Sequence, residues 1–219
     1  MKRVILLVWM VLFAASYAQN IQPEPLNLGI LKNTIEYYIK SGAYDSAMIA
    51  KYREIQASIE ERMEDGKKYA VVMDVDETTL SNIQFEFDYG FGFNPTIWKE
   101  WVAKGEATAI PAALKFFNWA KSKGIDIFFV TGRRMQAEKI EDDPTYKNLI
   151  KEGFIGFKKL YLKPAKGKIK TIVYKSSARK EIMDMGYIII ANIGDQWSDL
   201  EGGNAEMSFK LPNPMYYVK

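Results

Sequence analysis

Tyr69-Ala70-Val71-Val72-Met73 is a short, continuous apolar run, and the polar segment Asp74-Val75-Asp76-Glu77-Thr78-Thr79 follows it directly. An apolar run of this length is typical of a strand that is buried on both faces of a parallel sheet. Ligands of such sheets bind just beyond the carboxyl ends of the strands. The stretch therefore predicts a buried strand and, at its end, a candidate site.

Similar apolar runs recur further along the chain and are separated by segments with helical spacing. The runs span residues 125–130, 160–162 and 187–193, and the helical segments span residues 111–123, 134–152 and 176–185. Two amphipathic helices, at residues 26–40 and 44–65, precede the first strand, with a break at Gly42 and a stop at Gly66. Strands that alternate with helices predict an α/β fold, a three-layer sandwich in which a central parallel sheet lies between helices.

The polar residues at the strand ends form one pattern. Asp74 and Asp76 follow the first strand, Thr131-Gly132-Arg133 follows the second, and Gly194-Asp195-Gln196-Trp197-Ser198-Asp199 follows the fourth. Four aspartates are thus expected at one edge of the sheet, where like charges need a compensating cation. Oxygen-only ligands favour Mg²⁺. An isolated Asp-x-Asp equally suits a solvated turn, so the prediction depends on all three strand ends together.

The composition excludes several kinds of chemistry. The chain has 219 residues, 48% of them apolar, and contains no Cys and no His. Its length and apolar content fit one globular domain. Without Cys and His there can be no Cys-thiolate phosphatase or protease, no Ser-His-Asp triad, and no zinc site built on imidazole or thiolate. Any chemistry must therefore use carboxylates, hydroxyls, amines and a hard metal.

The first residues have the pattern of a secretory signal peptide. Met1-Lys2-Arg3 is followed by an apolar run from Val4 to Ala15 and by the small-residue segment Ser16-Tyr17-Ala18. This pattern predicts cleavage after residue 18, a domain over residues 19–219, and export to the periplasm or the exterior. Loss of Lys2 and Arg3 lowers the formal net charge from +3 to +1. So small a charge indicates no nucleic-acid polymer as partner.

With these motifs the sequence resembles the haloacid dehalogenase (HAD) superfamily, and within it the secreted class B-like acid phosphatases of plant vegetative-storage and bacterial outer-membrane type. The resemblance covers most of the chain after residue 18. It rests on residues 72–82 (VMDVDETTLSN), 130–133 (VTGR), 174–176 (YKS) with Arg179, 193–200 (IGDQWSDL) and 210–214 (KLPNP). It implies a HAD-like Rossmannoid sheet with a small cap or flap insertion at about residues 80–109. The lipid-attachment Cys of the bacterial outer-membrane members is missing, so no stable membrane anchor is expected.

The resemblance also implies roles for the strand-end residues. Asp74 would attack phosphorus and form an acyl-phosphate, and Asp76 would protonate the leaving alcohol and then take a proton from water. Mg²⁺ would be held by the carboxylates of Asp74 and Asp195 and the backbone carbonyl of Asp76, with Asp199 fixing metal-bound waters. Substrate oxygens would be bound by Thr131, by backbone N–H groups near Gly132, and by the amine of Lys175.

The basic residues need a separate argument, because lysines crowd the region around Lys175 and most lysines are solvated. Lys175 immediately precedes Ser176, where a helix is expected to begin, and from there it can point toward the sheet edge. Arg133 and Arg179 fit either a phosphate contact or a structural pair with Asp or Glu, and the sequence leaves both open.

The insertion is rich in aromatic residues at strict period two. They are Phe85, Phe87, Tyr89, Phe91 and Phe93, and Trp98 and Trp101 follow them. This alternation predicts one face of a β-hairpin or flap. The rings either pack on the domain or, in part, line a leaving-group pocket. In the second case they favour aromatic leaving groups, including nucleosides.

These observations predict a Mg²⁺-dependent acid phosphatase that hydrolyses small-molecule phosphate monoesters, with nucleoside monophosphates among its substrates. A nucleotide-sugar transferase would use Asp-x-Asp but not the downstream Thr, Lys and Gly-Asp-x-x-x-Asp set. A storage or phosphate-ester-binding protein on the same fold would be expected to lack the nucleophile, and Asp74 is present. A phosphotransferase also stays open, and the oligomeric state is not predicted.

Overall fold

The computed structural model describes residues 24–218, so the expected signal peptide lies outside the described residues. Helix α2 (Leu28–Lys40) and helix α3 (Ala43–Glu60) come first, close to their predicted ranges. The chain divides into two compact units at Thr34, and the fold below is that of the unit beginning at Ile35. Within the described part of the chain, no helix is both long enough and apolar enough to cross a membrane.

The centre of the fold is a parallel sheet with the strand order β5-β4-β1-β6-β7. Its strands are β1 (Tyr69–Met73), β4 (Asp126–Arg134), β5 (Lys159–Lys163), β6 (Ile188–Gly194) and β7 (Ser208–Lys210). Every residue of β1 is buried, as the apolar run predicts. The first four strands were predicted at nearly these positions. β7 was missed because three residues, Ser208, Phe209 and Lys210, form no apolar run.

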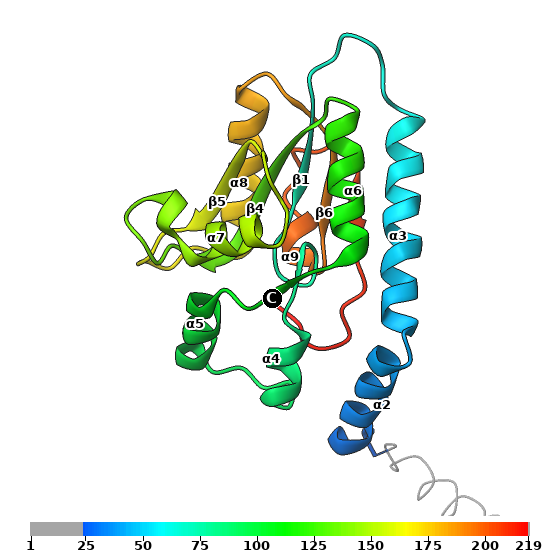
Figure 1. Ribbon diagram of the computed structural model, residues 1–219, viewed down its shortest axis with the longest axis vertical. Helices are drawn as coiled ribbons and strands as arrows, with labels where there is room; N and C mark the ends of the chain where they lie inside the picture. Colours follow the sequence, from blue (N-terminus) through cyan, green and yellow to red (C-terminus); the bar gives the residue numbers. More distant parts are fainter. Residues whose placement is uncertain (1–23, 219) are drawn as a thin grey trace, which may run out of the picture. The chain divides into compact units, whose positions relative to one another are not determined.

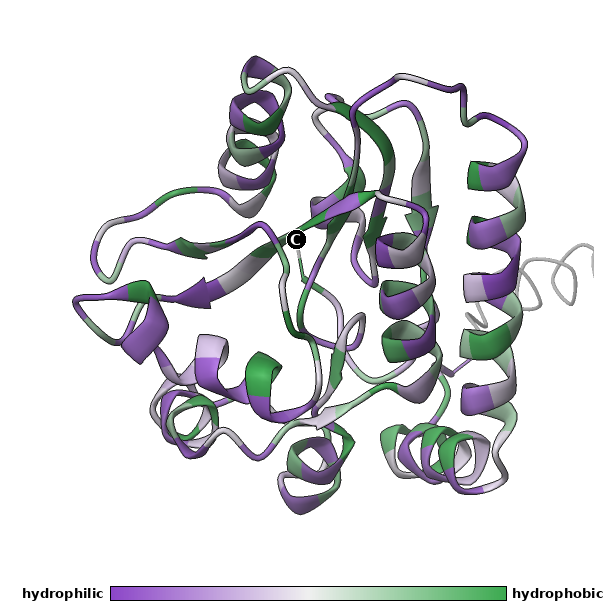
Figure 2. Cartoon of the chain, turned by 45° about the horizontal axis from the view of Figure 1, so that its top comes forward, coloured by the Kyte–Doolittle hydropathy of each residue, from purple (hydrophilic) through white to green (hydrophobic). Residues whose placement is uncertain are grey.

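Helices cover both faces of the sheet, which confirms the three-layer prediction. Alternate β1 residues face opposite ways: Val71 and Met73 belong to a core shared with α3 and α6 (Pro111–Ser122), whereas Ala70 and Val72 belong to a core shared with α8 (Thr171–Asp184). Figure 1 shows α3 and α6 side by side next to the sheet. In Figure 2, hydrophilic and hydrophobic residues alternate along these two helices, as expected for helices with one buried face.

The helix predicted over residues 134–152 is wrong in its first half. Strand β4 continues to Arg134, a 3-10 turn η1 spans Ile140–Asp142, and helix α7 spans only Pro144–Lys151. Asp143 sets the start of α7, because its side chain accepts a hydrogen bond from the Thr145 N–H and Pro144 occupies the first turn. Helix α8 begins earlier than predicted, at Thr171 rather than Ser176.

The hairpin predicted for the aromatic insertion is also wrong, because the insertion is helical. Helices α4 (Ile83–Asp88) and α5 (Pro95–Lys104) lie between the short antiparallel strands β2 (Leu80–Ser81) and β3 (Thr108–Ala109). A period-two run also contains i, i+4 pairs, and the structure uses these: the rings of Phe85 and Tyr89 lie 4.8 Å apart. We call α4, α5 and the loop between them the cap.

Candidate active site

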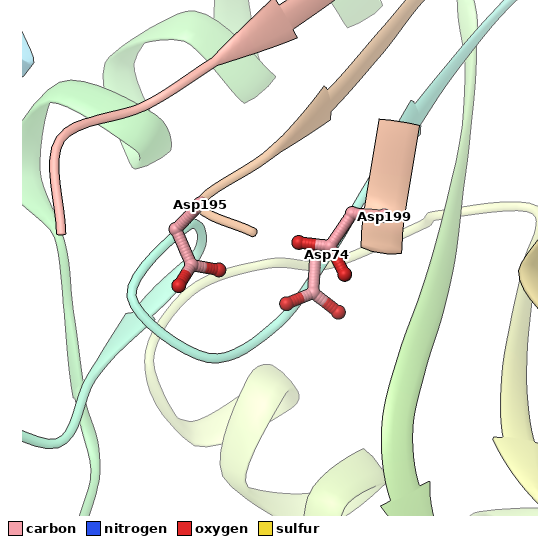
Figure 3. A group of neighbouring side chains, drawn as sticks. All are labelled: Asp74, Asp195 and Asp199. Carbon is pink, nitrogen blue, oxygen red and sulfur yellow. The ribbon is translucent and has the colours of Figure 1, made fainter. Parts of the chain in front are cut away.

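Three aspartates meet at the carboxyl ends of the central strands (Figure 3). Asp74 follows β1, Asp195 follows β6, and Asp199 lies in the short helix α9 (Trp197–Leu200). One carboxylate oxygen from each lies within 4.8 Å of the others, and the residues are only 6%, 1% and 4% exposed. Of the four aspartates expected at this edge, the carboxylates of Asp74, Asp195 and Asp199 therefore form the cluster, and that of Asp76 does not belong to it.

The loop after β6 brings Asp199 back against the end of its own strand. The Asp199 Oδ2 accepts a hydrogen bond from the Gln196 N–H at 2.9 Å and so caps α9. A Cβ at Gly194 would lie 2.4 Å from the Cβ of Asp199. Only glycine permits this close approach, which explains the Gly-Asp-x-x-x-Asp spacing in physical terms.

Lys175, from helix α8, also belongs to the cluster. Its Nζ donates to Oδ1 of Asp74 and, at 2.7 Å, to Oδ1 of Asp199. The residue is 2% exposed and lies in the second turn of α8, not just before the helix as predicted. Burial lowers the pKa of Lys175, but the two carboxylates outweigh this effect and hold the pKa above its usual value. Lys175 is therefore a buried cation bound to two of the three aspartates.

The donor set fits a divalent cation. Three buried carboxylates face one ammonium group, so the cluster keeps two uncompensated negative charges when all three are ionised. Burial raises the pKa of Asp74, Lys175 opposes this increase, and the neighbouring carboxylates add to it. Burial, then the charges of Asp199 and Glu77, raise the pKa of Asp195 to about 7. A hard dication bound by these oxygens would remove that cost.

Asp195 is held by side chains that the sequence argument did not single out. Its Oδ2 accepts hydrogen bonds from Gln196 Nε2 and Asn213 Nδ2, both at 2.7 Å, and its Oδ1 accepts one from Thr78 Oγ1 at 3.3 Å. Asn213 lies in the Lys-Leu-Pro-Asn-Pro segment that carried part of the resemblance, so that motif was the available signal. The C-terminal segment thus orients one of the three aspartates.

Glu77 closes the loop that carries Asp74 and Asp76. It is fully buried and accepts hydrogen bonds from the Asn82 N–H at 2.5 Å and from the Tyr216 hydroxyl at 2.6 Å. Its φ of 48° is left-handed, which is unusual for a residue other than glycine. These contacts hold a backbone turn that would otherwise be unfavourable.

Asp76 lies apart from the three-aspartate cluster. Its Oδ1 accepts hydrogen bonds from Arg133 Nε at 3.0 Å, Arg133 Nη2 at 2.7 Å and Asn82 Nδ2 at 2.9 Å. The structure thus pairs Arg133 with a carboxylate, one of the two alternatives the sequence left open. The Nη1 of Arg133 is buried and, within residues 24–218, has no hydrogen-bond partner. Arg133 therefore uses Nε and Nη2 on Asp76 and keeps Nη1 as an unused donor.

The other sequence-predicted residues occupy different places. Thr131 is fully buried near the end of β4, where its Oγ1 accepts from the Arg133 N–H at 3.1 Å, and Gly132 lies in the cavity wall described below. Arg179 donates to the backbone carbonyls of Asp199, Glu201 and Gly203. Since these carbonyls end α9 and begin the next loop, Arg179 is a structural residue that supports Asp199.

A cavity of about 500 Å³ connects the aspartate cluster to the cap. Asp74, Lys175, Asp195 and Asp199 line one end, and we call this the aspartate end. Glu86, Phe91, Phe93 and Trp98 line the other, which we call the cap end. Asp76 and Arg133 also lie in the cavity wall, as do Tyr216 and Tyr217 from the C-terminal segment. The cavity wall therefore combines charged residues from the strand ends with aromatic residues from the cap.

The aromatic stripe divides between core and cavity. Phe85 is 1% exposed and packs on Trp98 and Trp101, with ring centroids 5.1 and 5.8 Å away, so it is part of the core of the cap. Phe91 and Phe93 line the cavity instead, and Phe93 is 73% exposed. Glu86, between Phe85 and Phe87, was not singled out from the sequence because a charge within an aromatic run is usually solvated.

The protein is an α/β protein whose parallel sheet is covered by helices on both sides. Its carboxylates and lysine lie at the carboxyl ends of the strands, where ligands of such folds bind. The chain belongs to subfamily IIIB of the HAD superfamily, the acid phosphatase subfamily, whose family model matches residues 10–219. The resemblance stated from the sequence motifs is thereby confirmed.

Curated relatives come from plants. A stem 28 kDa glycoprotein of Glycine max is 41% identical over 69% of this chain and 61% of its own length. Acid phosphatase 1 of Solanum lycopersicum is 38% identical over 67% of this chain and 58% of its own length. Vegetative storage protein 1 of Arabidopsis thaliana is 36% identical over 67% of this chain and 54% of its own length. The chain spans only 52% to 61% of the length of these curated relatives.

A solved structure agrees with the fold. The class C acid phosphatase from Bacillus anthracis is 25% identical, with a TM-score of 0.66 over 87% of this chain and 85% of that one. This likeness confirms the HAD-like arrangement of the fold.

Proposed function

We propose that this protein is a Mg²⁺-dependent acid phosphatase that hydrolyses phosphate monoesters through an aspartyl-phosphate at Asp74. The observation that carries the proposal is the buried cluster of Asp74, Asp195 and Asp199 around Lys175, at the strand ends of an acid phosphatase fold. Covalent catalysis by a carboxylate suits a chain without Cys or His, because it needs neither a thiolate nor an imidazole.

Asp74 acts as the nucleophile in this proposal. A carboxylate oxygen forms a bond to phosphorus while the bond from phosphorus to the leaving oxygen breaks, and water then cleaves the acyl-phosphate. Lys175 binds Oδ1 and keeps the carboxylate oriented, while Oδ2 has no hydrogen bond within the described residues. The ammonium group also faces the incoming phosphoryl charge.

Asp76 gives a proton to the leaving alcohol and later removes one from the attacking water. Arg133 and Asn82 both bind its Oδ1, so the other carboxylate oxygen is left for this exchange in the cavity wall. Thr131 and the backbone around Gly132 are proposed to contact the transferring oxygens, as the resemblance implies.

The donor set described above would hold Mg²⁺ through Asp74, Asp195 and the Asp76 carbonyl, with Asp199 orienting bound water. When bound, the ion supplies positive charge for the phosphoryl oxygens. Gln196 and Asn213 hold Asp195 in position, and Arg179 donates a hydrogen bond to the backbone carbonyl of Asp199. The chain's own contribution is therefore the orientation of its oxygens.

The decisive experiment is a panel of aryl, alkyl and nucleoside phosphates assayed with chelator and then with Mg²⁺ restored. We expect hydrolysis that is lost in chelator and returns with Mg²⁺, and we expect nucleoside monophosphates to be accepted because aromatic rings line the cap end. Asp142→Asn is the matched control for Asp74→Asn, because Asp142 is exposed and belongs neither to the cluster nor to the cavity wall. Full activity in chelator would contradict the metal requirement.

A non-catalytic storage or phosphate-ester-binding role is the alternative, and the vegetative storage relative is the observation behind it. It predicts saturable ester binding with no turnover under any metal condition. A phosphotransferase would share Asp74 chemistry but pass the phosphoryl group to an alcohol, so product analysis with added alcohol separates the two activities.

Export is also proposed, from residues 1–18 alone. Cleavage after Ala18 would leave a chain that begins at Gln19. N-terminal sequencing of the protein recovered from outside the cytoplasm tests this, and recovery of an intact Met1 form in the cytoplasm alone would contradict it.

A further inference from the structure

Glu86 is a buried carboxylate in the wall of the cavity, at the cap end. It belongs to α4 and is 5% exposed. The same cavity is lined by the aromatic residues Phe91, Phe93 and Trp98 from the cap and by the aspartate cluster from the strand ends. The Glu86 side chain therefore faces the space that the organic half of a bound ester would occupy.

Among the described residues, Glu86 differs from every other buried carboxylate. Asp74, Glu77, Asp143, Asp195 and Asp199 each accept at least one hydrogen bond from a protein donor. The Glu86 carboxylate takes part in no hydrogen bond or ion pair with residues 24–218. The Glu86 oxygens are not among the fully enclosed polar atoms that lack a partner, so they open on to the cavity, where a ligand can supply the hydrogen bonds that the described residues do not.

The surroundings of Glu86 favour a cation as the missing partner. None of the three cations in the cavity wall bonds to Glu86: Arg133 binds Asp76 through Nε and Nη2, Lys175 binds two aspartates, and the Nζ of Lys163 donates to Thr171. Burial, and then the charge of Asp76, raise the pKa of Glu86 to about 7, so the surrounding protein groups stabilise its anion poorly. Phe91, Phe93 and Trp98 line the same cavity, and aromatic rings in general attract an ammonium group.

Resting on the proposed phosphatase function, we propose that Glu86 selects phosphate monoesters whose alcohol carries an ammonium group, which binds the Glu86 carboxylate while the phosphate lies at the aspartate end. The substrate class is thus the zwitterionic ester of an amino alcohol. Glu86 is a specificity residue in this scheme and takes no part in bond making or breaking.

Three aryl phosphates of nearly equal size test the proposal: 4-(aminomethyl)phenyl, 4-(hydroxymethyl)phenyl and 4-methylphenyl phosphate. At pH 8, where Glu86 is ionised and the amine is protonated, we expect kcat/KM for the aminomethyl ester to exceed that for the methyl ester by about tenfold or more. The hydroxymethyl ester should lie between them. Glu86→Gln should abolish most of the preference, and Glu100→Gln, at an exposed position of α5, should leave it unchanged.

The proposal is overturned if, in the wild type, the ratio of kcat/KM for the aminomethyl ester to that for the methyl ester is one or less. It is also overturned if a ratio above one persists in Glu86→Gln. Equal rates for the aminomethyl and hydroxymethyl esters overturn the requirement for a cation. If Glu86→Gln does not fold, Glu86→Met takes its place. This change removes the buried charge at similar length and is expected to raise the melting temperature.

Binding separates this inference from the proposed function. Calorimetry with 4-(aminomethyl)benzylphosphonate and 4-methylbenzylphosphonate measures the preference without turnover. A Glu86-dependent binding preference in a protein that hydrolyses no ester would overturn the phosphatase proposal and support the role of Glu86. Rapid hydrolysis of all three esters at equal rates would support the phosphatase and overturn the role of Glu86.

Discussion

The two ends of the cavity differ in how their polar side chains are held by the rest of the protein. At the aspartate end, Asp74 follows β1 while Asp195 and Asp199 share the segment after β6, and each is held by hydrogen bonds from Lys175, Gln196 or Asn213. At the cap end, the lining is aromatic, Phe93 is largely exposed, and the one carboxylate has no protein partner within the described residues.

From this difference we expect the aspartate end to determine the reaction and the cap end to determine which substrate is preferred. The aspartate end is a network of mutually bonded charges, so its geometry is specified closely and changes there should affect all substrates alike. The cap end offers apolar surface with few fixed polar contacts, so changes there should alter which substrate is preferred. The predictions below test this division.

The largest effect is expected at the aspartate end. Asp74→Asn removes the nucleophile but keeps the size of the side chain, so kcat should fall at least about a thousandfold on every phosphate ester. Steady-state kinetics with aryl and nucleoside phosphates, together with circular dichroism, measure this. Equal activity of the variant, or a loss confined to one substrate, would break the proposed division.

Asp76 is expected to show a leaving-group effect. Asp76→Asn should reduce kcat on alkyl phosphates by about 10² to 10⁴, because their alkoxides need a proton as they depart. Nitrophenyl phosphate should lose much less, since its leaving group is stable without one. Comparison of the two substrates in one variant is the measurement, and equal losses would remove Asp76 from the acid role.

Glu86 should make the free energy of unfolding depend on pH. Its folded pKa of about 7 is higher than its unfolded value, so the stabilisation is complete at low pH and is lost as pH rises through 7. The unfolding free energy of the wild type should therefore fall between pH 5 and pH 8 by on the order of 1 kcal/mol more than that of Glu86→Gln, because solvent in the cavity screens part of the effect.

Urea denaturation at these two pH values measures the difference. Glu100→Gln should follow the wild type, because Glu100 is exposed. Parallel pH profiles for the wild type and Glu86→Gln would show that Glu86 is not buried in solution as it is in the structure.

The smallest effect is expected for the aromatic residues at the cap end. Phe93→Ala should lower the preference for a nucleoside monophosphate over glycerol phosphate by a factor of about 5 to 150, because one stacked ring contributes about 1–3 kcal/mol. Phe85→Ala is the contrasting variant: it should lower the melting temperature and leave that ratio unchanged, because Phe85 lies in the core of the cap. A shift of the ratio in the Phe85 variant alone would contradict the division.

The sheet was predictable because each main strand is an apolar run with polar residues at its end. Runs such as Tyr69–Met73 must be buried on both faces, so local composition is sufficient to locate them. The cap was not predictable in the same way. Its period-two rings fit a strand and also contain i, i+4 helical pairs, and the packing of Phe85 on two tryptophans favours the helix.

The sequence by itself determined the parallel sheet, the order of its polar strand ends, and the choice of carboxylate chemistry in a chain without Cys or His. The tertiary structure alone decided the partners: Lys175 between Asp74 and Asp199, Arg133 on Asp76, Asn213 on Asp195, and no partner for Glu86 within the described residues. These pairs join segments far apart in the chain. Their distances depend on strand register and helix packing, which no local pattern of residues encodes.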